Sequence, residues 1–279
     1  MNNLRVVMLA AVTLAGTTGI ALGGDMSAHA IHCGDILGPK GHFQLQQDLD
    51  CSAVPPPLNQ MTALTIQDGA TLDLNGHIVT CGSQNIRCVV LTGTGTQLLD
   101  GVIRGGFASA LWIDGKGGHT VKNVTTLIGE DQIVVLSDNN RLVNVMAFAA
   151  NAFVISGNNN RITDSIAECG PSPVGLPCIV VRGDGNRLVD NFVTTPDGFQ
   201  IGLSIEGNNN VVEKNRAILN RGGLVTGGGG IVVTGTGNDI TNNTAFFNTP
   251  VDLQDKNGDC AHNKWKSNTF GTRDPACIQ

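Results

Sequence analysis

The chain has 279 residues, of which only 14% are charged and 37 are glycine, and its formal net charge is −6. The negative charge argues against a nucleic-acid partner, because there is no overall basic field to attract phosphates. The many glycines and few charges favour short strands joined by tight turns.

Residues 1–30 have the pattern of a secretory signal peptide. Arg5 provides a basic start, an apolar run continues to Leu22, and an A-x-A-like cleavage site ends at Ala30. A membrane anchor is the alternative, but the apolar run is short and is interrupted by glycine and threonine. No later segment is long and apolar enough to span a bilayer. We therefore expect a secreted or periplasmic protein with no membrane span after signal cleavage.

Three parts are expected after the signal. Residues 31–66 are predicted to form an N-terminal cap, in which an amphipathic stretch precedes a run of three prolines. Residues 67–248 contain a repeat and are predicted to form the body of the fold. Residues 249–279 are predicted to form a polar C-terminal cap, because the end of a repeat stack needs covering. No linker or low-complexity run indicates a second domain.

One pattern recurs through the predicted body: a turn, a short apolar run, an asparagine or aspartate corner, and another apolar run. The clearest copies read GNNNRITDSIA, GDGNRLVDNFV, GNNNVVEKNRA and GTGNDITNNTA. Aligning the copies places one apolar residue of each repeat in a column, at intervals of 20 to 28 residues: Leu98, Val121, Leu142, Ile162, Leu188, Val212 and Ile240. Such periods predict a solenoid, in which a repeat buries its apolar face only by stacking on its neighbours.

Alternation within a repeat predicts three short strands joined by tight corners. Polar corner residues also align between repeats: Asn123, Asn144, Asp164, Asp190 and Asn242, followed by Asn191, Asn215 and Asn243. Asparagine tolerates left-handed backbone, and stacked amides can hydrogen-bond from one coil to the next. We therefore assign these asparagines to the scaffold rather than to a binding site.

All eight cysteines lie after the signal and fall into close neighbours along the chain: Cys33 and Cys51, Cys81 and Cys88, Cys169 and Cys178, and Cys260 and Cys277. Four local disulfides in an oxidising compartment fit this spacing, although eight cysteines allow 105 connectivities. A zinc site is the alternative, but the chain has no C-x-x-C motif and no histidine pair with ligand spacing. We therefore predict the four sequential disulfides, with Cys169–Cys178 closing a loop that projects from the coils.

The repeats, the segment TLDLNGHIV at residues 71–79 and the ending from Asn263 to Ile278 resemble exported right-handed parallel β-helix proteins of the pectate-lyase-like superfamily. The resemblance covers roughly residues 65–279. It implies an all-β fold, a right-handed parallel β-helix of about seven to nine coils with N- and C-terminal caps.

That superfamily contains polysaccharide lyases, galacturonan hydrolases, uronate epimerases, metal-centre assembly proteins and non-catalytic adhesins. The chain has no DPHD string of the alginate epimerases and no paired-aspartate set of the galacturonan hydrolases. The calcium-carboxylate and arginine pattern of the pectate lyases does not match residue by residue either. No catalytic residue carries over from the resemblance, and enzyme status stays open.

One arginine follows the turn asparagine on each of three successive repeats, at Arg141, Arg161 and Arg187. Outward positions of stacked parallel strands form straight columns about 4.8 Å apart. Like charges at this spacing repel, and an acidic polysaccharide lying along the column would neutralise them, because guanidinium groups suit carboxylates. The alternative is pairing with local acids: Asp138, Asp164, Asp184 and Asp190.

A second outward column is predicted at the end of the first strand. It contains Asp114, then Leu136 or Ser137 in an ambiguous register, and later Arg182 beside Glu206. An acid next to an arginine is a candidate acid/base pair, and a surface salt bridge is the alternative. Trp112 is expected to face outward and to be able to stack on a sugar ring.

The connections after the third strand lengthen toward the C-terminus and are candidates for specificity loops: 168–178, 194–202 and 219–230. Glu130 and Asp131, on an earlier loop of the same side, form an adjacent acidic pair that could bind Ca²⁺ together with backbone oxygens. A solvated charged loop is the alternative. Calcium is the only cofactor that these residues suggest.

Two functions from different classes remain. In the first, the protein acts on or binds acidic polysaccharide in a lyase- or epimerase-like groove. A lyase or epimerase must neutralise the substrate carboxylate and have a base that abstracts a proton. Alternatively, it is a non-catalytic structural or binding protein of the envelope or the extracellular space. Metallocofactor assembly is a third function that occurs in the superfamily, but the chain has no histidine, methionine or cysteine cluster for it. Nothing in the sequence determines the oligomeric state.

Overall fold

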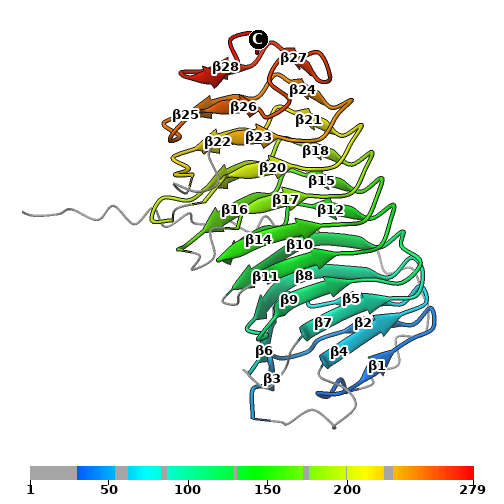
Figure 1. Cartoon of the computed structure of the whole chain (residues 1–279). Helices are drawn as coiled ribbons and strands as arrows, with labels where there is room; N and C mark the ends of the chain where they lie inside the picture. The colour runs from blue at the N-terminus through cyan, green and yellow to red at the C-terminus, as the bar shows by residue number, and fades with distance from the viewer. Residues whose placement is uncertain are drawn as a thin grey trace, which may run out of the picture.

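The computed structural model describes residues 30–53, 62–82, 87–127, 131–171, 176–198, 200–222 and 229–279, with only the main chain of Asp131. The predicted signal peptide therefore lies outside the described residues, apart from Ala30. Figure 1 shows short strands stacked coil upon coil between the N-terminal strands in blue and the C-terminal strands in red. Among the described residues, no helix is long and apolar enough to cross a membrane.

The first sheet has eleven parallel strands, one from each successive coil. They are β1 (Ile36–Leu37), β4 (Thr62–Gln67), β7 (Arg87–Thr92), β9 (Ser109–Ile113), β11 (Asp131–Val135), β14 (Asn151–Ile155), β17 (Ile179–Val181), β20 (Leu203–Ile205), β23 (Ile231–Val233), β26 (Leu253–Asp255) and β29 (Arg273–Asp274). Neighbouring strands in it pair in parallel, from β1 on β4 to β26 on β29.

The second and third sheets are built in the same way from the rest of each coil. The second contains β2 (His42–Gln44), β5 (Thr71–Asp73), the first halves of β8 (Gln97–Arg104) and β10 (Thr120–Leu127), β12 (Arg141–Val143), β15 (Arg161–Thr163), β18 (Arg187–Val189), β21 (Val211–Glu213), β24 (Asp239–Thr241) and β27 (Lys264–Lys266). The third contains β3 (Leu49–Cys51), β6 (Ile78–Cys81), the second halves of β8 and β10, β13 (Met146–Ala149), β16 (Ile166–Cys169), β19 (Phe192–Thr194), β22 (Arg216–Ile218), β25 (Thr244–Phe246) and β28 (Thr269–Phe270).

Three corners join these sheets. The first corner leads from the first sheet to the second, the second corner from the second to the third, and the third corner from the third sheet to the next coil. The protein is a right-handed parallel β-helix, as expected. Strands β1–β3 pair with β4–β6, so residues 36–51 of the predicted cap already follow the coil pattern.

The interior is filled by aligned apolar columns. The column predicted from the repeats is confirmed, because all seven of its residues are at most 1% exposed. Ala147, Ala167, Ala217 and Ala245 form the small-residue column beside it and are fully buried. At the C-terminal end Trp265 pairs with Ile240 in register, and its indole N–H donates to Asp255 Oδ2 at 2.8 Å. The wide indole thus covers the last coil.

Asparagine ladders hold the corners together. At the first corner each side-chain oxygen accepts the backbone N–H of the equivalent residue one coil below, at 2.7–2.9 Å, along His119, Asn140, Asn160, Asn186, Asn210, Asn238 and Asn263. At the second corner Asn191, Asn215, Asn243 and Asn268 do the same. The residues just outside this second ladder have positive φ, as predicted for Asn123, Asn144 and Asn242. The scaffold role of these asparagines is confirmed.

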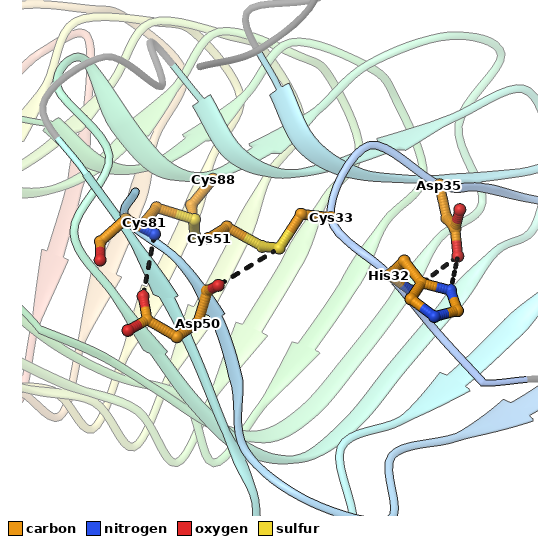
Figure 2. Close-up of a disulfide and its surroundings, with 8 residues drawn as sticks. His32, Cys33, Asp35, Asp50, Cys51, Cys81 and Cys88 are labelled. Atoms are coloured by element: carbon orange, nitrogen blue, oxygen red, sulfur yellow. Dashed lines mark hydrogen bonds and ion pairs between the residues drawn. A yellow bond between two sulfur atoms is a disulfide. The ribbon is translucent and has the colours of Figure 1, made fainter. Parts of the chain in front are cut away.

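The four predicted disulfides are confirmed, with sequence separations of 18, 7, 9 and 17 residues. Figure 2 shows Cys33–Cys51 close to Cys81 and Cys88, because Cys51 and Cys81 occupy paired positions of β3 and β6. Two disulfides thus join the first coils at the N-terminal end. Cys169–Cys178 joins the end of β16 to the residue before β17, across the third corner.

Candidate functional site

The predicted arginine column lies on the outside of the second sheet. Arg141 pairs with Arg161, and Arg161 pairs with Arg187, as the first residues of β12, β15 and β18. Each arginine follows a ladder asparagine that is turned into the coil and precedes a buried leucine or isoleucine, so alternation sends its own side chain outward. All three side chains are exposed. We call these three residues the arginine file.

Among the residues that the structure describes, one member of the arginine file has an acidic partner. Arg187 Nη2 lies 2.9 Å from Glu213 Oε2 on β21, one coil above. Arg141 and Arg161 form no ion pair or side-chain hydrogen bond with any residue that the structure describes. Two neighbouring guanidinium groups therefore point into solvent without a counter-charge from any described residue.

The four local aspartates that were the alternative partners of the arginines have other roles at the corners. Asp138 accepts the backbone N–H of Asn158 at 2.6 Å, and Asp184 accepts that of Asn208 at 2.6 Å. Both carboxylates thus belong to a hydrogen-bonded edge along the first corner. Asp164 and Asp190 occupy positive-φ positions of the second corner. Among the described ion pairs, none joins these four acids to an arginine.

Within the sheet, the outward positions beside the arginine file are neutral or basic. Thr120 precedes Arg141 in the column, and Val211 follows Arg187. The adjacent outward column runs from Lys122 on β10 through Val143, Thr163 and Val189 to Glu213. From β10 to β18 the outward positions of this sheet therefore contain cations and no acid. The first carboxylate reached along the face is Glu213, which already pairs with Arg187.

The second predicted column lies on the outside of the first sheet. Arg182 and Glu206 are adjacent there, with Nε 3.3 Å from Oε2, and their side chains are 47% and 40% exposed. The backbone N–H of Leu136 donates to Ile113, and Leu136 is exposed while Ser137 is buried. Leu136 is therefore the column member, which resolves the ambiguous register.

The structure does not bring Asp114 to the Arg182–Glu206 pair. Asp114 lies three coils below Arg182, with Leu136 and Ser156 between them in the column. At a strand spacing of about 4.8 Å this separates the two residues by roughly 14 Å. Arg182 and Glu206 by themselves form the geometry of a solvent-exposed salt bridge, a contact that contributes little to stability.

Trp112 faces outward, as predicted, but one face of its ring is occupied. The guanidinium carbon of Arg87 lies 3.6 Å from the ring centroid, a close cation–π contact. The indole N–H points to Asp114 Oδ2 at 3.5 Å. Arg87 was not a candidate from the sequence, because it lies at the start of β7, three residues before the position that pairs with Trp112. A sugar ring has at most the other face of this indole for stacking.

Of the predicted calcium pair, Glu130 and the side chain of Asp131 lie outside the described residues. In the part of the chain that the structure describes, no group of three or more histidine, cysteine, aspartate or glutamate side chains could hold a metal ion. A pocket of about 260 Å³ lies next to Cys169 at the third corner. It is lined by Phe148, Ala149, Glu168, Cys169, Gly170, Pro196 and Asp197.

Comparison with known proteins found one distant structural similarity. No protein-family model matches the chain. No curated protein matches it either. A crystal structure of pectate lyase Pel9A is similar, with 14% sequence identity, a TM-score of 0.42, and coverage of 88% of this chain and 71% of that one.

Proposed function

We propose that the protein is an exported β-helix protein that binds an acidic polysaccharide along the arginine file. The observation that carries the proposal is the absence of a described counter-charge for Arg141 and Arg161, which lie in register on neighbouring coils. Positive charges held side by side repel one another, and an anion bound across them removes that repulsion. The rigid stack of coils sets the two guanidinium groups in place before a ligand arrives.

The geometry of the arginine file supports an extended ligand with regularly spaced carboxylates. Neighbouring rungs are about 4.8 Å apart, which is on the scale of one sugar unit. A planar guanidinium group offers two parallel N–H donors that match the two oxygens of a uronate carboxylate. A polyuronate chain parallel to the solenoid axis would meet Lys122 first, then Arg141 and Arg161, and finally the paired Arg187.

The compartment supports the same class of ligand. Four disulfides are typical of proteins that fold outside the reducing cytosol, in a secreted or periplasmic setting. Acidic polysaccharides are polyanions of that setting. Phosphate-rich nucleic acids are a poorer match, because the file has few cations and the whole protein carries a net charge of −6.

The proposal is binding and not catalysis. A lyase or epimerase acting on the same polymers is the alternative, with Glu206 as the base and Arg182 neutralising the substrate carboxylate. The two residues are engaged with each other at 3.3 Å and lie on the first sheet, whereas the arginine file lies on the second. Binding by the file therefore requires no participation of that pair.

Arg161→Ala tests the proposal, because Arg161 is the middle residue of the file and its side chain points away from the core. Affinity for polygalacturonate or alginate, measured by titration calorimetry, is expected to fall about three- to tenfold, the range for one charge-assisted contact. Binding of the wild type should also weaken with added salt. Arg104→Ala, which removes an exposed arginine from the third sheet, is the matched control and should bind as wild type does.

Equal affinities of wild type and Arg161→Ala would refute the role of the arginine file. Binding of neutral dextran as tightly as polyuronate would refute the ionic recognition. The same samples, followed by absorbance for unsaturated sugar products, test the alternative. Product that forms with the wild type and disappears with Glu206→Gln would show a lyase.

A further inference from the structure

Two large apolar side chains project from the third corner of the upper coils. Leu219 follows β22 and Phe247 follows β25, and the N–H of Leu219 donates to the carbonyl of Phe246 at 3.2 Å, so the two turns stack. Their exposed fractions are 48% and 75%. In Figure 1, β22 and β25 end at the left-hand edge of the upper coils, where these turns lie.

The backbone at these positions does not favour such residues. Leu219 has φ 59° and Phe247 has φ 60°, in the left-handed region that bulky side chains rarely adopt. The second corner uses the same turn and fills the position with polar residues on every coil from β8 to β27: Asp100, Asn123, Asn144, Asp164, Asp190, Lys214, Asn242 and Ser267. Leucine and phenylalanine are thus exceptions to the pattern of this protein.

The hydrogen bonds that hold the third corner together come from the residue after Leu219 and the residue after Phe247, not from these two side chains. Asn220 and Asn248 point into the coil and form a short third ladder, in which Asn248 Oδ1 accepts the N–H of Asn220 at 2.8 Å. Asn215 and Asn243 perform the same task at the second corner after Lys214 and Asn242. An exposed apolar side chain in a disfavoured backbone conformation therefore indicates a surface role.

The neighbouring side chains extend this apolar surface. Ile218 and Phe246 occupy paired outward positions of β22 and β25, and the rings of Phe246 and Phe247 are 6.2 Å apart. We call Ile218, Leu219, Phe246 and Phe247 the third-corner patch. Its members come from two adjacent coils and form one continuous strip.

Basic side chains flank the third-corner patch. Arg216 begins β22 on the same outer face, and Arg221 follows two residues after Leu219, both exposed. Of the acids on this side, Glu168 and Asp197 belong to lower coils, where they line the 260 Å³ pocket. Asp252, on the upper coil, is buried, and both of its carboxylate oxygens accept hydrogen bonds. The surroundings of the patch are therefore positive on a protein whose total charge is negative.

We propose that the third-corner patch docks the protein on an anionic phospholipid surface. Phe247 and Leu219 enter the boundary between headgroups and acyl chains, and Arg216 and Arg221 contact the lipid phosphates. Apolar tips on a convex corner, flanked by cations, suit this interface. Two protein copies meeting patch to patch would instead place arginines against arginines, which opposes self-association. The patch is separate from the arginine file, so this docking does not depend on polysaccharide binding.

Flotation with lipid vesicles tests the proposal. The wild type is expected to float with vesicles of phosphatidylcholine and phosphatidylglycerol in equal parts, and much less with phosphatidylcholine alone. Phe247→Asn combined with Leu219→Asn should lower the partition coefficient about tenfold or more, because the buried apolar area is lost. Arg216→Gln should lower it about fivefold, as expected for one cation at an anionic surface.

The asparagine substitutions serve as their own folding control. Asparagine accepts left-handed backbone, so the double variant should melt at the same temperature as the wild type or higher. Its affinity for polyuronate should be unchanged, which separates this surface from the arginine file. Membrane docking is refuted if the wild type does not float with the anionic vesicles or if the folded double variant floats equally well. Self-association of the wild type that the double variant loses would also refute it, in favour of a protein interface.

Discussion

Among single residues, His119 shows how the scaffold responds when an asparagine is replaced. It occupies the first-corner ladder below Asn140 and is fully buried. Its Nδ1 accepts the N–H of Thr96 at 3.1 Å and lies 2.6 Å from Thr96 Oγ1, and its Nε2 lies 2.8 Å from the carbonyl oxygen of Asp114. These contacts match a neutral ring with its proton on Nε2. Burial lowers the pKa of His119 below its ordinary value, and the hydrogen bond to Asp114 opposes this only in part.

His119 is therefore predicted to make stability depend on pH. Its pKa is lower in the folded than in the unfolded protein, so the unfolded state takes up a proton first as pH falls below about 6.5. The contribution is present above that pH and is lost as pH falls toward the folded-state pKa. Urea unfolding at several pH values should show a decline that His119→Asn abolishes, because an asparagine Oδ1 can accept the Thr96 N–H as it does in the coils above.

His262→Asn is the matched control, since His262 is exposed. Its pH profile should follow that of the wild type. A decline of equal size in His119→Asn and the wild type would show that other groups cause it.

Among elements, the third corner differs from the other two. The first and second corners are short turns whose asparagines bond from coil to coil, and their geometry repeats with little change. The third-corner connections vary in length, and one is closed by Cys169–Cys178, which joins β16 to the start of β17. This corner also contains the third-corner patch and the pocket with Glu168. The constant corners maintain the register, and the variable corner provides the individual features.

The Cys169–Cys178 disulfide is predicted to stabilise the coils on both sides of it. Its loop of 9 residues is short, so the entropy lost by the unfolded chain corresponds to about 2–3 kcal/mol. Cys169→Ala combined with Cys178→Ala should lower the free energy of unfolding by about that amount in urea titrations. An unchanged unfolding midpoint would contradict the prediction. A control in which the wild type is reduced before unfolding should show a larger loss, because all four bridges then open.

Across the whole molecule, the β-helix is a linear array in which each coil contacts mainly the coils directly below and above it. Strand pairing follows this rule through all three sheets, as between β15 and β18 or between β16 and β19. Stability in such arrays is close to a sum of coil and interface contributions. A whole coil should therefore be removable if the two new neighbours present the same register.

Deletion of residues 161–186 is predicted to give a folded protein that is one coil shorter. It joins Asn160 to Arg187, keeps the first-corner ladder continuous and removes both Cys169 and Cys178, so no free thiol remains. The melting temperature should fall, because one stacking interface is lost. Far-ultraviolet circular dichroism should retain the β spectrum, and polyuronate affinity should fall, because the file keeps only Arg141 and Arg187.

Deletion of residues 161–185 is the control, because the one additional residue reverses which side chains of the joined strand face the core. That variant should aggregate or unfold. If both deletions behave alike, register does not govern the folding of the array.

The sequence by itself determined the repeated features of this protein. The column from Leu98 to Ile240, the asparagine corners and the outward direction of the arginine file all follow from alternation and spacing within one repeat. The four disulfides follow from the spacing of neighbouring cysteines along the chain. Because the coils stack in register, equivalent residues of every repeat take the same inward or outward position. A pattern that recurs many times is therefore compatible with one arrangement of the strands. The adjacency of Arg182 and Glu206 was predictable for the same reason.

The tertiary structure alone decided which side chains from different coils meet. Glu213 rather than a local aspartate pairs with Arg187, Arg87 covers one face of Trp112, and Leu136 rather than Ser137 faces outward. It also placed Leu219 and Phe247 in left-handed turns that the repeats do not predict. These contacts depend on the length of each third-corner connection and on the reach of long side chains between coils. The periodicity of a single strand sets the direction of each side chain. It does not set the distance between side chains on different coils.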